Sequence, residues 1–561
     1  MLQINNLHLS LNTDNGVFIA LNNISLTVNA QQCTAVVGES GSGKTLTSLA
    51  VMGLLPQKAI HSISGEILFH SPTKGKIDLL KLEPYQWQKI RGKEIAMIFQ
   101  EPMTALNPVY TCGKQLYENI GLNQKFSKKE IKEKAIALLE EVKLHDVERI
   151  LASYPHQLSG GQRQRVMIAM ALAQNPSLLI ADEPTTALDV TVQAAIMDLL
   201  RELQHSRQLG ILFISHDLGL VRSIAQQVVV MYKGQVMESN AAESIFTSPQ
   251  SIYTQALLQC SPATHPNAQV LPTLKDFFDE TPTGLVAKPY TPFAENRLKK
   301  VTSEDAVISI NNLFVEYGND GGFSFLKKKE GKKVLNDVSL DIYKGETLAV
   351  VGESGSGKTT LGMSILQTTQ ITGGTIDYAG KTFDLKKYTG RKEFRKYFQL
   401  VFQDPYSSLN PRITIGSQID EAVKNFDNTT NAKTRTYELL KMVGLDETAY
   451  PKYPHEFSGG QRQRICIARA LAPNPQFLVL DEAVSALDVS VQAQVLNLLK
   501  KLQEELGLTY FFITHDLNVA RFIADRILVI QNGQVVELQD TESLFTKPQS
   551  AYTQQLLSAA H

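Results

Sequence analysis

The stretch GESGSGKT occurs twice in the chain, at residues 38–45 and again at residues 352–359. Both copies fit the pattern G-x-x-x-x-G-K-[ST], in which the glycines let backbone N–H groups curl around a phosphate while the lysine reaches the outer phosphates. The threonine after each lysine offers a hydroxyl that can bind Mg²⁺. The repeated pattern predicts two nucleotide sites in one chain.

Each copy also lies in the expected surroundings. The short β-branched runs TAVVG (34–38) and TLAVVG (347–352) predict buried strands, and TLTSLAVMGLL (45–55) and TTLGMSILQ (359–367) predict helices. The positive end of such a helix faces the phosphates, which makes an unliganded glycine turn a poor alternative. The predicted nucleotide-binding residues of the two loops are Gly38, Glu39, Ser40, Gly41, Ser42, Gly43, Lys44 and Thr45, and Gly352, Glu353, Ser354, Gly355, Ser356, Gly357, Lys358, Thr359 and Thr360.

Composition excludes several classes of protein. Of the 561 residues, 55 are Lys or Arg and 56 are Asp or Glu, so the net charge of −1 gives no general attraction to nucleic acid. The four cysteines lack C-x-x-C pairs, which argues against a disulfide framework, a zinc site or an iron–sulfur cluster and favours a reducing compartment. No apolar run approaches 18 residues and the N-terminus lacks signal-peptide features, so we expect a chain that neither spans a membrane nor is exported.

The repeat extends far beyond the loops. Serine, aspartate and histidine motifs recur at a constant separation of 299 residues, as in Ser159 and Ser458, and the chain tails FTSPQSIYTQALL (246–258) and FTKPQSAYTQQLL (545–557) match as well. Between the copies, prolines and a lack of apolar periodicity predict either an extended linker or an irregular tail packed on the first domain. We therefore expect two α/β domains, 1–258 and 306–561, joined by the linker 259–305.

Two acidic residues follow an apolar strand in each half. SLLIADEP (177–184) and FLVLDEA (477–483) have the form expected where a buried strand delivers carboxylates to a phosphate site. The first acid of each pair, Asp182 or Asp481, is a predicted Mg²⁺ ligand together with Thr45 or Thr359. The second acid, Glu183 or Glu482, is predicted to polarise the water that attacks the γ-phosphate.

Further motifs resemble those of ABC-type ATPases. LSGGQRQR (158–165) and FSGGQRQR (457–464) resemble the family's signature motif, and ALD (187–189 and 486–488) resembles its D-loop. The resemblance implies P-loop domains with a RecA-like core, an antiparallel β part and a helical subdomain. It further implies that ATP binds between domains arranged head to tail, with Lys44 and Glu183 opposite Ser458 and with Lys358 and Glu482 opposite Ser159. The resemblance also implies that the signature motifs bind the γ-phosphate, through Ser159, Gly160, Gly161 and Gln162 and through Ser458, Gly459, Gly460 and Gln461. It implies that His216 and His515 are switch residues, and that Gln100 and Gln403 take part in catalysis and in Mg²⁺ binding.

The segments IFQEPMTALNPV (98–109) and VFQDPYSSLNPR (401–412) narrow the resemblance to the peptide and nickel import ATPases. Importers of this group commonly use two different ATPase subunits, and the chain is similar to both in series, with Met170 in the first half where Arg469 stands in the second. The resemblance implies two membrane permease subunits, an extracytoplasmic binding protein and a peripheral position on the cytoplasmic face of the bacterial inner membrane. Peptides are the leading solute, with modified peptides, glutathione and nickel chelates as alternatives.

Other functions of tandem ABC ATPases are less well supported. A ribosome-binding ATPase is expected to have a highly charged helical linker, whereas the linker of this chain is rich in proline. A DNA-repair ATPase is expected to have zinc-binding cysteine pairs, which this chain lacks. An exporter remains open, because ATP chemistry has no direction of its own. Only Cys260 lies where many separate subunits of this group carry an iron–sulfur cysteine cluster, so no cluster is expected.

The halves also differ near the expected adenine position. Tyr317 stands where the family places an aromatic that stacks on the base, whereas the equivalent residue of the first half is Leu11. Stacking on an aromatic contributes about 1–3 kcal/mol, so weaker ATP binding is expected at the first site. Phe18 is an alternative source of the ring, a choice that the sequence leaves open.

Overall fold

The computed structural model describes residues 1–13, 16–100, 105–122, 126–186, 188–281, 284–290, 305–318, 332–380, 388–426 and 431–559. The chain divides into two compact units. Unit 1 comprises Met1–Leu188, Val192–Gln259 and Leu274–Tyr290, and unit 2 comprises Asp189–Thr191, Cys260–Thr273 and Thr291–His561. Glu101–Thr104 of the first glutamine segment and Ala187 of the first ALD motif lie outside the described residues.

Unit 1 contains a six-stranded, mostly parallel sheet. The strands, in spatial order, are β10 (Gln235–Ala241), β9 (Gln227–Tyr232), β3 (Cys33–Val37), β8 (Gly210–Ser215), β7 (Leu178–Asp182) and β6 (Ile95–Ile98). Every residue of β3, β7 and β8 is buried, which is why their sequences are continuous apolar runs rather than alternating ones. Because β3 pairs in parallel with β8 and β9, the loop after it emerges at the centre of one sheet edge.

An antiparallel sheet packs beside this core in unit 1. Its strands are β2 (Gly16–Val28), β1 (Leu2–Thr13), β4 (Ile60–Ser71) and β5 (Gly75–Asp78), in that order. The buried alternate residues of β1, such as Leu2, Ile4 and Leu9, join Val36 and Ile180 of the parallel sheet in one hydrophobic core. The two sheets are therefore held together by a shared apolar interior.

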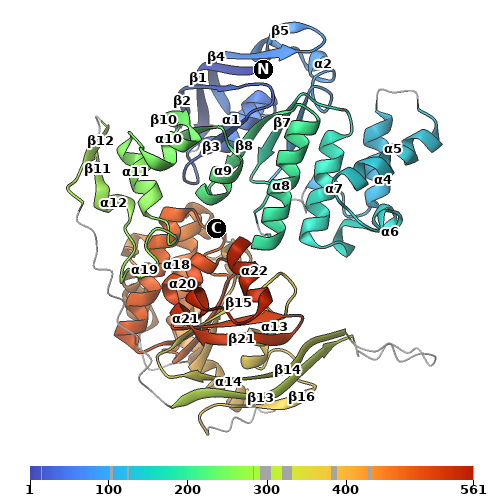
Figure 1. Ribbon diagram of the computed structural model, residues 1–561. Coiled ribbons are helices and arrows are strands. Elements are labelled where there is room, and N and C mark those ends of the chain that lie inside the picture. Colours follow the sequence, from blue (N-terminus) through green and yellow to red (C-terminus); the bar gives the residue numbers. More distant parts are fainter. Residues whose placement is uncertain are drawn as a thin grey trace. The chain divides into compact units, whose positions relative to one another are not determined.

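The helices of unit 1 fall into two sets. Around the sheets lie α1 (Lys44–Val51), α2 (Pro84–Trp87), α8 (Val190–Ser206), α9 (Leu218–Ile224), α10 (Ala242–Thr247) and α11 (Ile252–Gln259). A helical part is formed by α4 (Cys112–Gly121), α5 (Lys128–Glu141), α6 (Val147–Ala152) and α7 (Gly160–Leu172), which contact one another and appear side by side in Figure 1. Short 3₁₀ turns complete the unit at Gln57–Ala59, Leu79–Lys81 and Pro155–Gln157.

Unit 2 repeats this architecture. Its mostly parallel sheet has the order β17 (Phe398–Val401), β18 (Phe477–Asp481), β19 (Thr509–Ile513), β15 (Thr347–Val351), β20 (Arg526–Gln531) and β21 (Gln534–Asp540). The antiparallel sheet has the order β14 (Lys332–Tyr343), β13 (Ala306–Tyr317) and β16 (Gly373–Asp377). The helices are α13 (Lys358–Ile365), α14 (Tyr388–Tyr397), α15 (Pro405–Ser408), α16 (Ile415–Phe426), α17 (Ala432–Met442), α18 (Gly459–Leu471), α19 (Val489–Leu506), α20 (Leu517–Ile523), α21 (Thr541–Thr546) and α22 (Ala551–Ala559), with 3₁₀ turns at Glu447–Ala449 and Pro454–Glu456.

These two units confirm the predicted fold class, because each contains a parallel core, an antiparallel sheet and a helical part. Within the part of the chain that the structure describes, no helix combines the length and apolar character needed to cross a bilayer.

The described part of the stretch between the repeats, residues 259–281 and 284–290, contains secondary structure and tertiary contacts. Residues 274–290 belong to unit 1 and contain α12 (Leu274–Phe277) and the hairpin of β11 (Phe278–Thr281) and β12 (Gly284–Ala287), labelled in Figure 1. Residues 260–273 belong to unit 2, where the backbone of Leu271 exchanges two hydrogen bonds of 2.8 Å with the Asn497 side chain. Sequence periodicity did not predict either part, because each is held by contacts with residues that are distant in the sequence.

A buried carboxyl group distinguishes the sheet of unit 2 from that of unit 1. Glu346, just before β15, is fully buried, accepts the backbone N–H of Tyr343 at 2.8 Å and lies 3.4 Å from the Arg526 guanidinium. Burial raises the pKa of Glu346 to about 7, against the partial compensation of these two groups. The residue at the corresponding place in unit 1 is Gln32.

Replacement of this carboxyl group is expected to change how stability depends on pH. The folded protein binds the Glu346 proton more tightly than the unfolded chain does, so the contribution of this group to the stability of unit 2 falls as pH rises from about 4.5 to about 7. Glu346→Gln, which copies the residue of unit 1, should remove this contribution. Thermal unfolding followed from pH 5 to pH 8 should show the variant gaining stability relative to wild type as pH rises. A difference that stays constant across this range would contradict the assignment.

Candidate functional site

The two phosphate-loop sequences occupy the same place in both units, between a central strand and the helix that follows it. The loop from Gly38 joins β3 to α1, and the loop from Gly352 joins β15 to α13. Gly38 has φ 148°, and a Cβ placed on it would lie 2.1 Å from the carbonyl oxygen of Met231. Gly352 has φ 151° and would meet the carbonyl of Ile530 at 2.2 Å. Only glycine permits this approach of loop to strand.

The loop lysines lie within their own loops. Lys44 Nζ donates to the carbonyl oxygens of Gly38 at 2.6 Å and Glu39 at 2.8 Å, and Lys358 Nζ donates to those of Gly352 at 2.7 Å and Glu353 at 2.8 Å. Both lysines are 6% exposed, and burial lowers the pKa of Lys358. These short bonds hold each ammonium group at the mouth of its loop.

Two buried hydroxyl groups support a ligand in these loops. Ser42 and Ser356 are 2% and 5% exposed, and the Oγ atom of neither finds a hydrogen-bond partner among the described residues. Buried polar groups are normally satisfied, and a phosphate oxygen would satisfy both. The remaining predicted loop residues, Ser40, Gly41, Gly43, Thr45, Ser354, Gly355, Gly357, Thr359 and Thr360, lie in the same two segments.

The donor atoms expected of a Mg²⁺ site come together in both units. Thr45 Oγ1 lies 3.4 Å from Asp182 Oδ1, and Thr359 Oγ1 lies 3.1 Å from Asp481 Oδ1, although the members of each pair are more than 120 residues apart. Burial raises the pKa of each aspartate to about 6. One hydroxyl and one carboxylate fit Mg²⁺, which takes few protein ligands and keeps water and phosphate oxygens around it.

The second acid of each pair is held by a glutamine and a histidine, and in unit 1 also by a threonine hydroxyl. In unit 1, Glu183 accepts hydrogen bonds from Gln100 Nε2 at 2.9 Å and Thr186 Oγ1 at 3.0 Å, and one of its oxygens lies 3.2 Å from His216 Nδ1. Thr186 was not predicted from the sequence, although a hydroxyl residue three positions after the glutamate recurs as Ser485. The predicted glutamine, glutamate and histidine thus meet at one point of unit 1.

The corresponding carboxylate of unit 2 is held by the equivalent glutamine and histidine, whereas the Ser485 hydroxyl donates to the backbone carbonyl oxygen of Glu482. Glu482 accepts from Gln403 Nε2 at 2.7 Å and lies 3.3 Å from His515 Nδ1. Glu183 and Glu482 also share a left-handed backbone conformation, with φ 46° and 47°. Such a conformation is uncommon for a residue other than glycine and costs about 1–3 kcal/mol, which is typical of residues held in place for function.

The electrostatic balance keeps these carboxylates ionised. Burial by itself would raise the pKa of Glu183 and Glu482, but hydrogen bonding and the charge of His216 or His515 outweigh it, so both pKa values lie below the ordinary range. Burial opposes the charge of His515, yet Glu482 raises the pKa of this histidine. An ionised carboxylate of this kind can accept a hydrogen bond from water.

The signature serines begin helices. Ser159 caps α7 and Ser458 caps α18, and each hydroxyl accepts the backbone N–H of the glutamine three residues later, Gln162 or Gln461. Both serines are exposed. The glycines of the motif, Gly160, Gly161, Gly459 and Gly460, form the first turns; a Cβ on Gly460 would lie 2.1 Å from Val491 Cγ1, so the turn packs against α19. Each of these helices therefore begins at an exposed serine.

An exposed aromatic side chain lies on the antiparallel sheet of each unit. Tyr317, at the end of β13, is 49% exposed. Leu11 is partly buried against the core, but its direct partner on β2 is Phe18, whose side chain is 57% exposed. An exposed ring is thus present in both units, and Phe18 is the candidate for stacking on the base at the first site.

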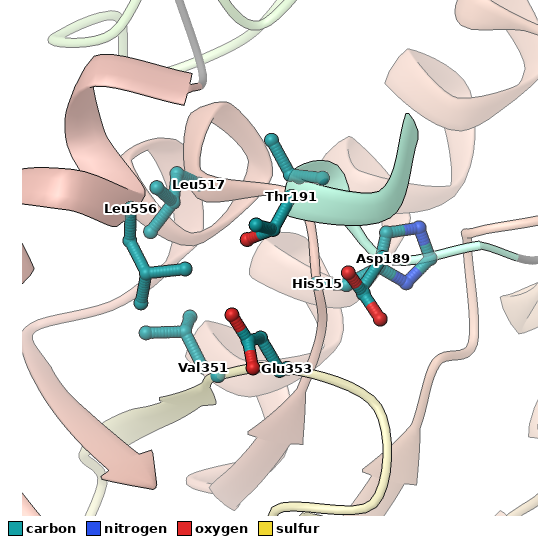
Figure 2. Close-up of a pocket in the computed structure, with 9 residues that line it drawn as sticks. Asp189, Thr191, Val351, Glu353, His515, Leu517 and Leu556 are labelled. Atoms are coloured by element: carbon teal, nitrogen blue, oxygen red, sulfur yellow. The ribbon is translucent and has the colours of Figure 1, made fainter. Parts of the chain in front are cut away.

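A pocket in unit 2 adjoins the second loop, as Figure 2 shows. Val351 and Glu353 of the loop region, Leu517 of α20 and Leu556 of α22 face it, together with His515. The complete lining is Asp189, Val190, Thr191, Val351, Gly352, Glu353, His515, Leu517 and Leu556.

Family models match both halves of the chain. The model described as "ABC transporter" matches residues 21–186 and 335–485, and that described as "Oligopeptide/dipeptide transporter, C-terminal region" matches residues 237–284. The second match includes the first PQSIYT tail and part of the ordered stretch after it.

Similar proteins match over the whole length. The glutathione import ATP-binding protein GsiA of Escherichia coli (strain K12) is 43% identical over 563 aligned residues, which cover 100% of this chain and 89% of the relative. GsiA of Salmonella typhimurium is 41% identical with the same coverage. The fold is similar to a chain in the crystal structure of archaeal ribosomal stalk protein aP1 with ribosome recycling factor aABCE1 (TM-score 0.60, 18% identity, 95% of this chain and 90% of that one).

The match to the ABC transporter model and the full-length identity to import ATP-binding proteins confirm the family that the sequence motifs indicate. The chain belongs to the ABC transporter family, as an ATP-binding and ATP-hydrolysing protein of the peptide-importer type.

Proposed function

We propose that this ATPase energises the import of peptide-like solutes through a membrane permease made of two further subunits, supplied by an extracytoplasmic binding protein. The observation that carries the proposal is that one chain contains two sites of the same kind, each combining a phosphate loop with a buried aspartate and an ionised glutamate. Glutathione is the first solute to test, because the similar GsiA proteins are named for its import. Other peptides and nickel chelates are the alternatives.

Within each domain, we assign the residues the following roles. Lys44 or Lys358 binds the outer phosphates, and Glu183 or Glu482 orients and polarises the attacking water. The glutamine and histidine beside each glutamate hold its carboxylate in place. Thr45 with Asp182, and Thr359 with Asp481, would hold Mg²⁺, which when bound stabilises negative charge on the phosphates.

We further propose that residues 1–258 and 306–561 act as the two domains and complete each other's sites. The exposed serine at the start of each signature helix supports this pairing, because a helix N-terminus attracts an anion such as the γ-phosphate of a nucleotide bound by the other domain. In this arrangement Ser458 serves the nucleotide of Lys44, and Ser159 serves that of Lys358. The protein would act at the cytoplasmic face of the membrane, bound to its permease.

Replacement of the catalytic carboxylates should separate binding from hydrolysis. Glu183→Gln or Glu482→Gln keeps the size and the left-handed backbone but removes the base, so hydrolysis at that site should fall on the order of 100-fold or more while ATP binding persists. Steady-state turnover and equilibrium ATP binding provide the two measurements. Glu243→Gln, on the exposed first turn of α10, serves as a control that keeps full turnover.

The same variants reveal which serine serves which site. In a Glu183→Gln protein the residual turnover comes from the second site, so Ser159→Arg should abolish it and Ser458→Arg should not. The reverse pattern, or equal loss from both changes, would contradict the proposed pairing.

The ring of Phe18 is expected to stack on the base at the first site. Phe18→Ala should weaken ATP binding there by about 1–3 kcal/mol, which is roughly 5- to 150-fold. The measurement is ATP affinity in a Lys358→Ala background that reports the first site alone. Val17→Ala, a comparably exposed neighbour on β2, is the matched control; an equal effect of the two changes would show that the ring is not required.

The partner proposal is tested by isolating the tagged full-length chain from membranes and identifying what accompanies it. Two integral-membrane permease subunits are expected, and recovery with ribosomes instead would overturn the transport role. Once the complex is reconstituted in vesicles, binding protein loaded with glutathione, with a dipeptide or with a nickel chelate should stimulate ATP hydrolysis according to the true solute.

A further inference from the structure

The tail motif P-Q-S-x-Y-T is repeated at residues 249–254 and 548–553, yet none of its residues belongs to the catalytic set. In unit 2 the motif leads into α22, which directly follows the last strand and α21 of the core. The contacts of this segment lead back to the second phosphate loop.

A buried glutamate fixes the start of α22. Glu537 on β21 is 6% exposed and accepts hydrogen bonds from the backbone N–H groups of Gln549 at 2.8 Å and Ser550 at 3.0 Å, and from Thr553 Oγ1 at 2.6 Å. These donors lie just before α22 and in its first turn, so the carboxylate fixes the path by which the chain enters the helix. Glu238 of unit 1 accepts the equivalent N–H groups of Gln250 and Ser251 at 2.9 and 3.0 Å. The anchor is thus built in both repeats.

This anchor directs one face of α22 at the second phosphate loop. Tyr552 and Leu556, four residues apart, pack with Val351 and Leu517 in one hydrophobic cluster. Leu556, Val351 and Glu353 face the same pocket in Figure 2. The Tyr552 hydroxyl accepts the backbone N–H of Glu353 at 3.1 Å.

The peptide group that joins Gly352 to Glu353 is therefore held at both ends. Its carbonyl oxygen accepts Lys358 Nζ at 2.7 Å, and its N–H group donates to Tyr552. The lysine has three N–H donors, and a bound phosphate competes for them. Tyr552 is then the side chain whose hold on this peptide does not depend on the nucleotide.

We propose that Tyr552 is a positioning residue of the second ATP site, which sets the orientation of the Gly352–Glu353 peptide so that the loop is ready for phosphate. The inference rests on the proposed role of Lys358 and its loop in ATP binding. It gives the C-terminal tail, anchored by Glu537, a function in nucleotide affinity. Burial raises the pKa of Tyr552, so the phenol remains neutral over the pH range of the assay.

The first repeat surrounds its equivalent tyrosine differently. Tyr253 is fully buried, and its ring lies 4.5 Å from that of Tyr232 and 6.3 Å from that of Phe278, centroid to centroid. Gln531 replaces Tyr232 in unit 2. Glu280 of β11 accepts hydrogen bonds from Tyr232 and Lys233, so the stretch between the repeats braces the tyrosine of the first unit. The assignment is made for the second site, where the bond from the Glu353 N–H to the Tyr552 hydroxyl is observed.

The test uses Tyr552→Phe, which removes one oxygen and keeps the ring, in a Glu183→Gln protein whose turnover comes from the second site. The KM for ATP is expected to rise roughly 2- to 10-fold, as for loss of one hydrogen bond, with a smaller change in kcat. Affinity for adenosine, which has no phosphate, should be unchanged.

Tyr510→Phe is the matched control. Its hydroxyl is also buried and donates to the carbonyl oxygen of Leu499 at 2.9 Å, away from the loop, so the variant loses a comparable bond and should keep the parent's KM. An unchanged KM in Tyr552→Phe, or equal losses of ATP and adenosine affinity, would overturn the inference. Failure of the proposed function would instead appear in the Glu183→Gln parent, as an absence of ATP binding.

Discussion

The close approach of the phosphate loop to the neighbouring strand is the constraint on which the rest of each unit depends. Gly38 lies against the carbonyl of Met231 and Gly352 against that of Ile530, at distances that exclude any side chain. The approach is possible because β3 and β15 are central strands, each flanked by two parallel partners. The loop therefore emerges at the sheet edge where the neighbouring strands also deliver their polar residues.

Two adjacent carboxyl groups lie at this sheet edge in each unit, and their surroundings shift their pKa values in opposite directions. Asp182 and Glu183 are adjacent in sequence but have opposite pKa shifts. Burial raises the pKa of the aspartate, whereas for the glutamate hydrogen bonds and the charges of His216 and Lys44 together outweigh burial and lower the pKa. The same division separates Asp481 from Glu482. Two neighbouring carboxyl groups thus suit two tasks, one as a ligand for a cation and the other as an ionised acceptor for water.

The two units share this chemistry but support it differently. In unit 2, Arg469 of the signature helix donates to the carbonyl oxygen of Ser408, within the glutamine segment 401–412, at 2.5 Å, whereas Met170 stands at the position of Arg469 in unit 1. The hairpin of β11 and β12 braces unit 1, and the segment 260–273 packs on α19 of unit 2. The stretch between the repeats is hence a structural part of both units, and the chain is not a simple duplication.

The sequence by itself determined the fold class, the repeat, the two loops and most of the side chains around each glutamate, because strong local patterns encode them. Glycines at fixed spacing, buried apolar strands ending in Asp-Glu and the signature motif require no knowledge of distant contacts. Tertiary structure alone decided which hydroxyls face the carboxylates, where Phe18 lies relative to Leu11, and what the tail tyrosine touches. It also decided the order of residues 260–281 and 284–290, whose contacts lie far away along the chain. The physical reason is that hydrogen bonding and burial depend on which segments meet in space, whereas local patterns reveal only the kind of element that each segment forms.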